Sequence, residues 1–297
     1  MQISITALSK TYRGDVRALT DVTLELAPGT TGLLGANGAG KTTLMRILTG
    51  IIRPTTGTVT VGGHDLASIA GRTAVKRLLG YLPQELDLYP DLTGREFLDY
   101  VALLKGIDDK PARHHQIDTL LDRVALTEVA RRRVGGYSGG MKRRLGIAQA
   151  LLGDPRLVIV DEPTAGLDPE ERMRFRSLLA SLGENRTVIL STHILDDVAQ
   201  TCPRVTVLAA GRLVYDGTTT ALAGQATGHT FTVTTPGPPP AGEHAVVTAA
   251  ATPTGTTYRI VTDTPPPGAT PVDPGLEDGY LALMRAARAA TAAESNR

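Results

Sequence analysis

The sequence predicts an α/β fold with two additions, an inserted α-helical segment and a small α+β extension at the carboxyl end. Three observations support this prediction. An apolar strand enters a glycine-rich loop that is followed by a helix. Residues 93–152 then change to helical periodicity, and after about residue 224 the composition shifts to Thr, Pro, Ala and Gly. We therefore expect a large domain over residues 1–224, with a helical subdomain at about 93–152, and an accessory domain over residues 225–297.

The bulk composition excludes several classes of protein. With 31 basic and 30 acidic side chains in 297 residues, no global field favours nucleic acid, and we expect no nucleic-acid partner. The segment Met1–Thr6 alternates like a strand instead of following a signal-peptide pattern, and no apolar run approaches the roughly 20 residues that cross a bilayer. We expect a cytoplasmic chain without a transmembrane segment of its own. A single cysteine, Cys202, fits that compartment and is expected to be inert.

The first elements are strands. Residues Ile3–Leu8 alternate, Val22, Leu24 and Leu26 alternate before a Pro-Gly turn, and Thr31–Leu34 lead into the glycine-rich loop. After the loop, Leu44, Ile47 and Leu48 recur at helical spacing, and Gly50 is placed to end that helix. Strand, glycine loop and helix in this order are typical of phosphate sites.

The middle of the sequence is helical and then returns to strands. Thr93 and Glu96 have the spacing of a capping box at a helix start. Apolar residues at helical spacing follow, with few strand signals before residue 152. Leu157–Val160 and Val188–Leu190 are apolar runs of strand length with a helix-like segment between them.

The carboxyl extension is predicted to be folded and not a disordered tail. Phe231 and Val233, like Tyr258 and Ile260, alternate as in short strands. Residues 276–293 favour a helix with apolar residues on one side. These patterns predict a small α+β unit.

The glycine-rich loop has the spacing of a phosphate-binding loop, Gly35-Ala36-Asn37-Gly38-Ala39-Gly40-Lys41-Thr42. Glycines let backbone N–H groups turn toward phosphates, and the following helix adds its positive end. Lys41 would neutralise β/γ charge, and the Thr42 hydroxyl would coordinate Mg²⁺. A plain glycine turn is the alternative, but strand and helix flank this loop as a phosphate site requires.

The strand ending in Asp161-Glu162 supplies the second element of a nucleotide hydrolase. Asp161 would hold Mg²⁺ through its water shell, and Glu162 could orient and deprotonate an attacking water. Alone, such a pair is more often a helix cap. Together with the phosphate loop it indicates hydrolysis.

At Tyr137-Ser138-Gly139-Gly140-Met141 the sequence resembles the ATP-binding cassette (ABC) signature, and with it a P-loop NTPase core with a β-rich amino-terminal subdomain. The resemblance covers about residues 1–220 because the order of elements fits: phosphate loop, Gln84, signature, acidic strand, Ala165-Gly166-Leu167-Asp168, and His193. It implies that Tyr12 stacks on adenine, Gln84 senses the γ-phosphate and Mg²⁺, His193 contacts the γ-phosphate, and Asp168 lies at a dimer seam. Met141 departs from the glutamine that is common there, which puts one peripheral contact in doubt.

The expected site residues follow from these motifs. Catalytic roles are expected for Glu162, His193, Gln84 and Lys41, and metal contacts for Thr42, Gln84 and Asp161. The residues expected to bind ATP are Tyr12, Gly35, Asn37, Gly38, Gly40, Lys41, Thr42, Thr43, Ser138, Gly139 and Gly140.

The signature also has a physical interpretation. Ser138 can cap a helix whose first N–H groups, at Gly139 and Gly140, stay bare and form an anion site. Lys142, Arg143 and Arg144 would lie in the first turn, where cations oppose the helix dipole, and a solvated basic face is the plain interpretation of some of them.

The leading hypothesis is an ATP-hydrolysing subunit that powers a separate membrane permease, with export favoured by the resemblance of residues 93–152 and of Leu276-Glu277-Asp278 to exporter subunits. One loop and one signature per chain imply a head-to-tail homodimer or heterodimer at the inner face of the cell membrane. The alternatives are a soluble cassette acting as a nucleotide-dependent switch on ribosomes or DNA, and a pure ATP-binding module. The sequence does not name the transported substrate.

Overall fold

The computed structural model describes residues 1–164, 167–183 and 186–295. A six-stranded sheet in the order β10-β9-β3-β8-β7-β6 forms its centre. The strands from β9 to β6 run parallel, and β10 is antiparallel to β9. Their bounds are β3 Gly29–Leu34, β6 Leu79–Leu82, β7 Leu157–Asp161, β8 Thr187–Ser191, β9 Arg204–Ala209 and β10 Arg212–Thr218.

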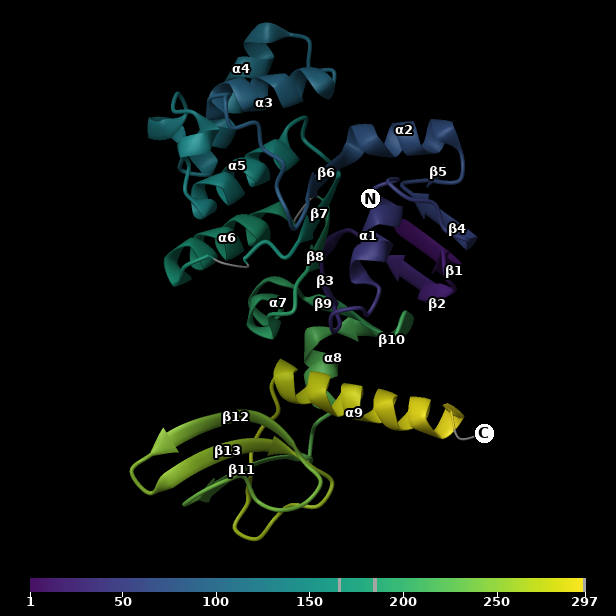
Figure 1. Cartoon of the computed structure of the whole chain (residues 1–297), viewed down its shortest axis with the longest axis vertical. Helices are drawn as coiled ribbons and strands as arrows, with labels where there is room; N and C mark the ends of the chain where they lie inside the picture. The colour runs from purple at the N-terminus through teal and green to yellow at the C-terminus, as the bar shows by residue number, and fades with distance from the viewer. Residues whose placement is uncertain (165–166, 184–185, 296–297) are drawn as a thin grey trace.

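A second, antiparallel sheet in the order β2-β1-β4-β5 covers one side of the central sheet (Figure 1). Its strands are β1 Ile3–Tyr12, β2 Val16–Leu26, β4 Thr56–Val61 and β5 His64–Asp65. Helix α1, Lys41–Leu48, follows the glycine-rich loop as expected, and α2, Ile69–Leu78, precedes β6. The predicted amino-terminal strands and first helix are confirmed.

The central sheet is buried on both faces, which explains its continuous apolar runs. Along β7, Leu157 and Ile159 belong to the core shared with α1 and the antiparallel sheet. Val158 and Val160 belong to the opposite core, shared with the helices. Alternation along one strand therefore joins the two cores of the large domain.

The predicted helical insert contains α3 Gly94–Leu104, α4 Lys110–Arg123 and α5 Gly139–Leu151. Two 3₁₀ turns, Thr127–Val129 and Val134–Gly136, connect α4 to α5. Thr93 and Glu96 form the expected capping box, in which the Thr93 hydroxyl accepts from the Glu96 N–H and Glu96 accepts from the Thr93 N–H. Beyond β7 the chain forms α6, Pro169–Leu182, and α7, Leu195–Thr201.

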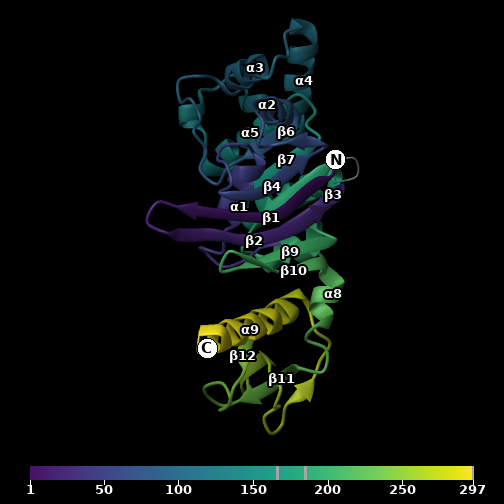
Figure 2. The same ribbon diagram turned by 90° about the vertical axis from the view of Figure 1, so that its right-hand side faces the viewer.

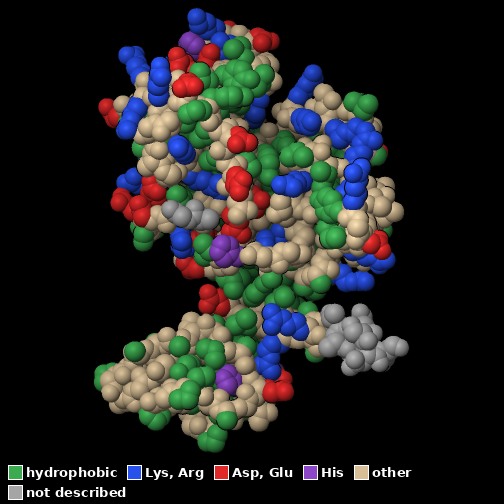
Figure 3. Space-filling model, viewed as in Figure 1, with side chains coloured by type: hydrophobic (Ala, Val, Ile, Leu, Met, Phe, Trp, Pro, Cys, Tyr) green, Lys and Arg blue, Asp and Glu red, His purple; other side chains and the backbone are tan. Residues whose placement is uncertain are grey.

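The carboxyl extension is a four-stranded sheet, order β12-β13-β11-β14, with a long helix lying across it (Figure 2). After α8, Thr219–Gly224, its elements are β11 Thr230–Thr235, β12 Ala245–Thr252, β13 Gly255–Val261, β14 Thr270–Pro271 and α9 Leu276–Ser295. The face seen in Figure 3 carries few charged side chains on this sheet. Leu276 of α9 is buried in the same apolar cluster as Leu222 of α8 and the helical core of the large domain, so α9 anchors the extension there.

The amino ends of the central strands are joined by main-chain hydrogen bonds. Gly29 N–H donates to the Arg186 carbonyl at 2.9 Å, Thr187 N–H to Arg156 at 3.0 Å, and Arg156 N–H to Leu78 at 2.9 Å. This edge is therefore occupied by backbone contacts. In the described part of the chain, no helix combines the length and apolar character that a bilayer span requires.

Candidate functional site

The carboxyl ends of four adjacent parallel strands open on one pocket of about 630 Å³. The phosphate loop follows β3, and Gln84 follows β6. Asp161 ends β7, Glu162 comes directly after it, and His193 follows β8. Ligand sites of open α/β sheets form at this edge, because loops leaving neighbouring strands converge there. The pocket thus gathers residues that are distant in sequence.

The phosphate loop is a tight backbone turn that only glycine can complete. Gly40 caps α1 with φ of 104°, and a Cβ atom there would lie 2.5 Å from the Ala18 carbonyl oxygen. The Lys41 ammonium donates to the carbonyls of Gly35 at 2.6 Å and Ala36 at 3.3 Å. Burial lowers the pKa of Lys41, opposed by the nearby carboxylates of Glu162 and Asp161. A buried ammonium beside a bare helix start is a site for anionic oxygens.

The two carboxylates of β7 lie in different surroundings. Asp161 is buried, and this burial raises the pKa of its carboxyl group. Glu162 adopts the left-handed backbone region with φ of 45°, and its N–H donates to the Ser191 carbonyl at 2.8 Å. Its Oε2 lies 2.8 Å from Nδ1 of His193. The turn therefore directs Glu162 toward His193 in the pocket.

Tyr12 lies at the outer end of the pocket. Its hydroxyl is 3.4 Å from Thr43 Oγ1, and its ring is 39% exposed. The Lys10 ammonium is 5.3 Å from the ring centroid. An exposed ring above a phosphate loop can accept the flat face of a base.

The signature segment lies apart from this pocket. Ser138 is the N-cap of α5, and its Oγ accepts from the Met141 N–H at 3.2 Å. Of the described residues that line the pocket, none belongs to the signature. The Glu171 carboxylate lies against Gly140, where a Cβ atom would be 2.1 Å from it, so a larger residue at Gly140 would have to displace that side chain. The predicted cap is confirmed, but one chain does not bring it to the phosphate loop.

Known proteins share both the sequence and the fold. The ABC transporter family model matches residues 19–165. An uncharacterised ABC transporter ATP-binding protein, YxlF of Bacillus subtilis, is 38% identical over 232 residues, covering 78% of this chain and 76% of that protein. The daunorubicin resistance ATP-binding protein DrrA3 of Streptomyces coeruleorubidus is 40% identical over 218 residues, covering 73% and 68%. This chain belongs to the ABC transporter ATP-binding proteins.

Two further similarities extend this result. ATP-binding cassette sub-family A member 7 of Mus musculus is 39% identical over 233 residues. The match covers 77% of this chain and 11% of that much longer protein. The ATP-binding cassette MJ0796, solved as a dimer in a post-hydrolysis state bound to ADP and Pi, superposes with a TM-score of 0.67 at 25% identity, covering 73% of this chain and 98% of that one. The cassette is thus an ATP-hydrolysing transport subunit with the expected P-loop fold, and not a switch acting on ribosomes.

The structure corrects the expectation for the basic residues after the signature. Helix α5 begins at Gly139, so Arg143 and Arg144 lie beyond its first turn. Arg143 is 7% exposed, and its guanidinium is surrounded by backbone carbonyls instead of solvent. The sequence does contain a signal for this burial. Arg143 is spaced four residues from Ile147, which is four residues from Leu151, and residues four apart share one face of a helix.

Several other expected residues have defined positions. Asp168 caps α6, accepting from the Glu171 N–H at 2.8 Å, and Met141 packs against the helical core. Ala165 and Gly166, named with the expected dimer seam, lie outside the described residues. Cys202 is buried, as expected for an inert thiol.

Proposed function

We propose that this cassette couples ATP binding, dimerisation and hydrolysis to export through a separate membrane permease, at the inner face of the cell membrane. DrrA3, a relative named for daunorubicin resistance, supports the export direction. Helix α9 begins with the segment Leu276-Glu277-Asp278, which resembles exporter subunits. The permease, and not the cassette, selects the cargo.

Within the pocket, the proposed roles follow from position and chemistry. The phosphate loop and Lys41 bind the triphosphate, and Tyr12 with Thr43 lies where the nucleoside would extend. Glu162 acts as the general base that orients and deprotonates water. The 2.8 Å contact with His193 holds the Glu162 carboxylate while His193, 61% exposed, meets the γ-phosphate.

The side chains present fit a bound Mg²⁺. Thr42 offers a hydroxyl, Gln84 an amide oxygen, and Asp161 a buried carboxylate, and all three line the same pocket. Burial raises the pKa of Asp161, and a cation bound there would oppose that effect by favouring the charged carboxylate. Among the described residues no cluster of three or more His, Cys, Asp or Glu could hold a metal, so phosphate and water oxygens would complete the shell. The ion would neutralise charge developing on the γ-phosphate.

The single observation that supports a dimer is that the two anion-binding elements, the phosphate loop and the signature, lie apart in one chain. The phosphate loop lines the pocket, whereas Ser138, Gly139 and Gly140 present their helix start elsewhere. A second chain in head-to-tail orientation would bring its own Ser138 to this pocket. Two composite sites would form, and hydrolysis would weaken both.

Complementation between two inactive variants tests this arrangement. Lys41→Ala removes the phosphate-loop cation, and Ser138→Arg blocks the signature start. Each variant alone should lose ATPase activity. In a mixture, one site of each heterodimer combines the intact Lys41 of one chain with the intact Ser138 of the other, so part of the activity should return.

The control mixes Lys41→Ala with the double variant Lys41→Ala/Ser138→Arg, in which no intact composite site can form. This mixture should stay inactive. Equal recovery in both mixtures, or none in the first, would contradict a shared site.

A further inference from the structure

The guanidinium of Arg143 lies in a cage of five backbone carbonyls. Nε donates to Pro163 at 3.0 Å, and Nη1 donates to Pro83 at 3.0 Å and Gln84 at 2.8 Å. Nη2 donates to Asp161 at 2.6 Å and to Glu162. An arginine has five N–H donors, so each one is matched with an acceptor.

The five carbonyls come from the two segments that carry the proposed chemistry. Pro83 and Gln84 follow β6, and residues 161–163 form the turn after β7. Arg143 itself lies one turn into α5, the helix that Ser138 caps. One side chain therefore joins the γ-phosphate-sensing segment, the general base and the signature helix.

The turn that Arg143 holds is one that the backbone does not prefer. A non-glycine residue in the left-handed region costs on the order of 1 kcal/mol, and Glu162 has φ of 45°. Its peptide is fixed on one side by the N–H bond to Ser191 and on the other by its carbonyl bond to Arg143. Without Arg143, three successive carbonyls would lose a buried donor, and the turn could relax.

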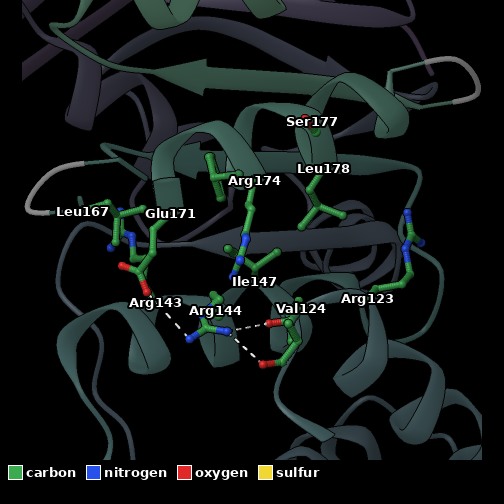
Figure 4. Close-up of a pocket in the computed structure, with 12 residues that line it drawn as sticks. Arg123, Val124, Arg143, Arg144, Ile147, Leu167, Glu171, Arg174, Ser177 and Leu178 are labelled. Carbon is green, nitrogen blue, oxygen red and sulfur yellow. Dashed lines mark hydrogen bonds and ion pairs between the residues drawn. The ribbon is translucent and has the colours of Figure 1, made fainter. Parts of the chain in front are cut away.

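On the side of α5 that faces α6, a pocket interrupts the packing of the two helices. A pocket of about 410 Å³ separates α5 from α6, with Ile147 and Leu178 projecting into it (Figure 4). On its rim Arg144 donates to the carbonyls of Val124 and Ala125, which belong to the helical insert itself. Arg144 also lies 3.6 Å from the Glu171 carboxylate of α6, so the Arg143 cage adds to the ionic and apolar contacts that join α5 to the rest of the domain.

We propose that Arg143 is a positioning residue that keeps Glu162 and Gln84 aligned with the signature helix, so that movement of α5 reaches the water-activating carboxylate. This inference rests on the proposed function, in which Glu162 is the general base and Ser138 meets the partner's ATP. In the described part of the chain, the hydrogen bonds of the Arg143 guanidinium go to main-chain carbonyls, so Arg143 acts through the positions of Glu162 and Gln84.

Substitution of Arg143 should lower turnover far more than ATP binding. The acceptors of Arg143 among the described residues lie outside the phosphate loop, so Arg143→Met should bind ATP with near wild-type affinity. A misplaced general base costs on the order of 100-fold in rate, so kcat should fall by about that factor while the KM for ATP changes little. Arg143→Lys, with three donors in place of five, should retain an intermediate rate.

A double-mutant cycle with Glu162→Asp separates positioning from general stability. The shorter Asp already misplaces the carboxylate, so adding Arg143→Met should cost much less than it does in the wild-type background. Equal losses in both backgrounds would overturn the inference. Full activity of Glu162→Asp would instead contradict the general-base role, while normal activity of Arg143→Met beside an impaired Glu162→Asp would contradict only the role of Arg143.

Arg113→Met provides the matched control. Arg113 is also buried, and it donates to the carbonyls of Ile107 and Asp108 and to Asp99 within the helical insert. Its loss should lower the melting temperature without changing kcat per folded molecule. If Arg143→Met and Arg113→Met lower kcat equally at matched stability, Arg143 has no special role. Where Arg143→Met fails to fold, Arg143→Lys gives the same comparison.

Discussion

At the scale of single residues, burial decides which reactive groups are available. Cys202 is 3% exposed, and its Sγ lies against Thr201, 3.4 Å from the hydroxyl. Burial raises the pKa of this thiol to about 11. The thiolate is the reactive form of cysteine. Cys202 should therefore react slowly, because little of its thiol is ionised near neutral pH and because reagents in solvent cannot reach its sulfur.

We expect native protein at mildly alkaline pH to react slowly with a disulfide reagent such as Ellman's, and to react at once when denaturant is added. Release of the thionitrobenzoate chromophore measures both rates. Fast labelling of the folded protein, at a rate independent of denaturant, would contradict the burial of Cys202.

Residues that occupy fixed offsets from a strand end could be predicted from the sequence. Lys41, Asp161 and His193 each follow an apolar strand, so their common edge follows from a parallel sheet. Arg143 could not be assigned in that way. Its acceptors lie 18 to 60 residues away in sequence, and only tertiary packing brings them together.

At the scale of elements, a half-buried lysine joins the end of α3 to the central sheet. The Lys105 ammonium donates to the carbonyls of Leu152 at 2.7 Å and Leu79 at 3.4 Å. Burial lowers its pKa to about 8. Between that value and the ordinary lysine pKa of 10.5, the unfolded chain binds more protons than the folded one, so this group makes the free energy of unfolding rise with pH.

Urea unfolding of wild type and Lys105→Met should reveal the contribution of Lys105 to the pH dependence of stability. The wild-type free energy of unfolding, relative to the variant, should increase as pH rises from about 8 toward 10.5. Lys76→Met, an exposed lysine on α2, is the control. A relative stability of Lys105→Met that is constant with pH would contradict the assignment.

Elements with strong periodicity were predicted, and weakly patterned ones were not. Helix α3 has a capping box and an apolar face, and its start at Gly94 followed from Thr93. Strand β12 is mostly alanine and threonine and largely exposed, so no alternation marked it. Strand β6 has only the residues Leu79–Leu82, too few to establish a period, although it carries Gln84 to the site.

At the scale of the whole molecule, an ion pair between a half-buried arginine and a buried aspartate joins the sheet and the long helix of the carboxyl extension. The Arg259 guanidinium on β13 bonds Asp278 through Nε at 2.9 Å and Nη2 at 2.7 Å. Asp278 also accepts from the Gly275 N–H at 2.6 Å, just before α9. The sequence could not predict this contact. Arg259 is on a strand and Asp278 on a helix, and no sequence motif indicates how these two elements pack.

Asp278→Ala should destabilise the extension by about 1–3 kcal/mol, because the Gly275 N–H and the half-buried Arg259 guanidinium lose a charged acceptor, although Nη2 of Arg259 keeps its bond to the Asp273 carbonyl. ATP affinity should be unchanged, because the nucleotide pocket does not include these residues. Urea unfolding and titration with a fluorescent nucleotide measure the two effects. Asp263→Asn is the control, since its pair with His229 is exposed and should contribute little. A parallel fall in ATP affinity would contradict the separation.

The main-chain bonds that close the amino edge of the central sheet have a consequence for engineering. That rim is built from contacts among Gly29, Arg186, Thr187 and Arg156, at the opposite ends of the strands from the residues of the pocket. A label attached near Asp154 would stand a full strand length from the chemistry. A reporter group can therefore be attached at the amino edge of the sheet without occupying the carboxyl edge, where the nucleotide pocket lies.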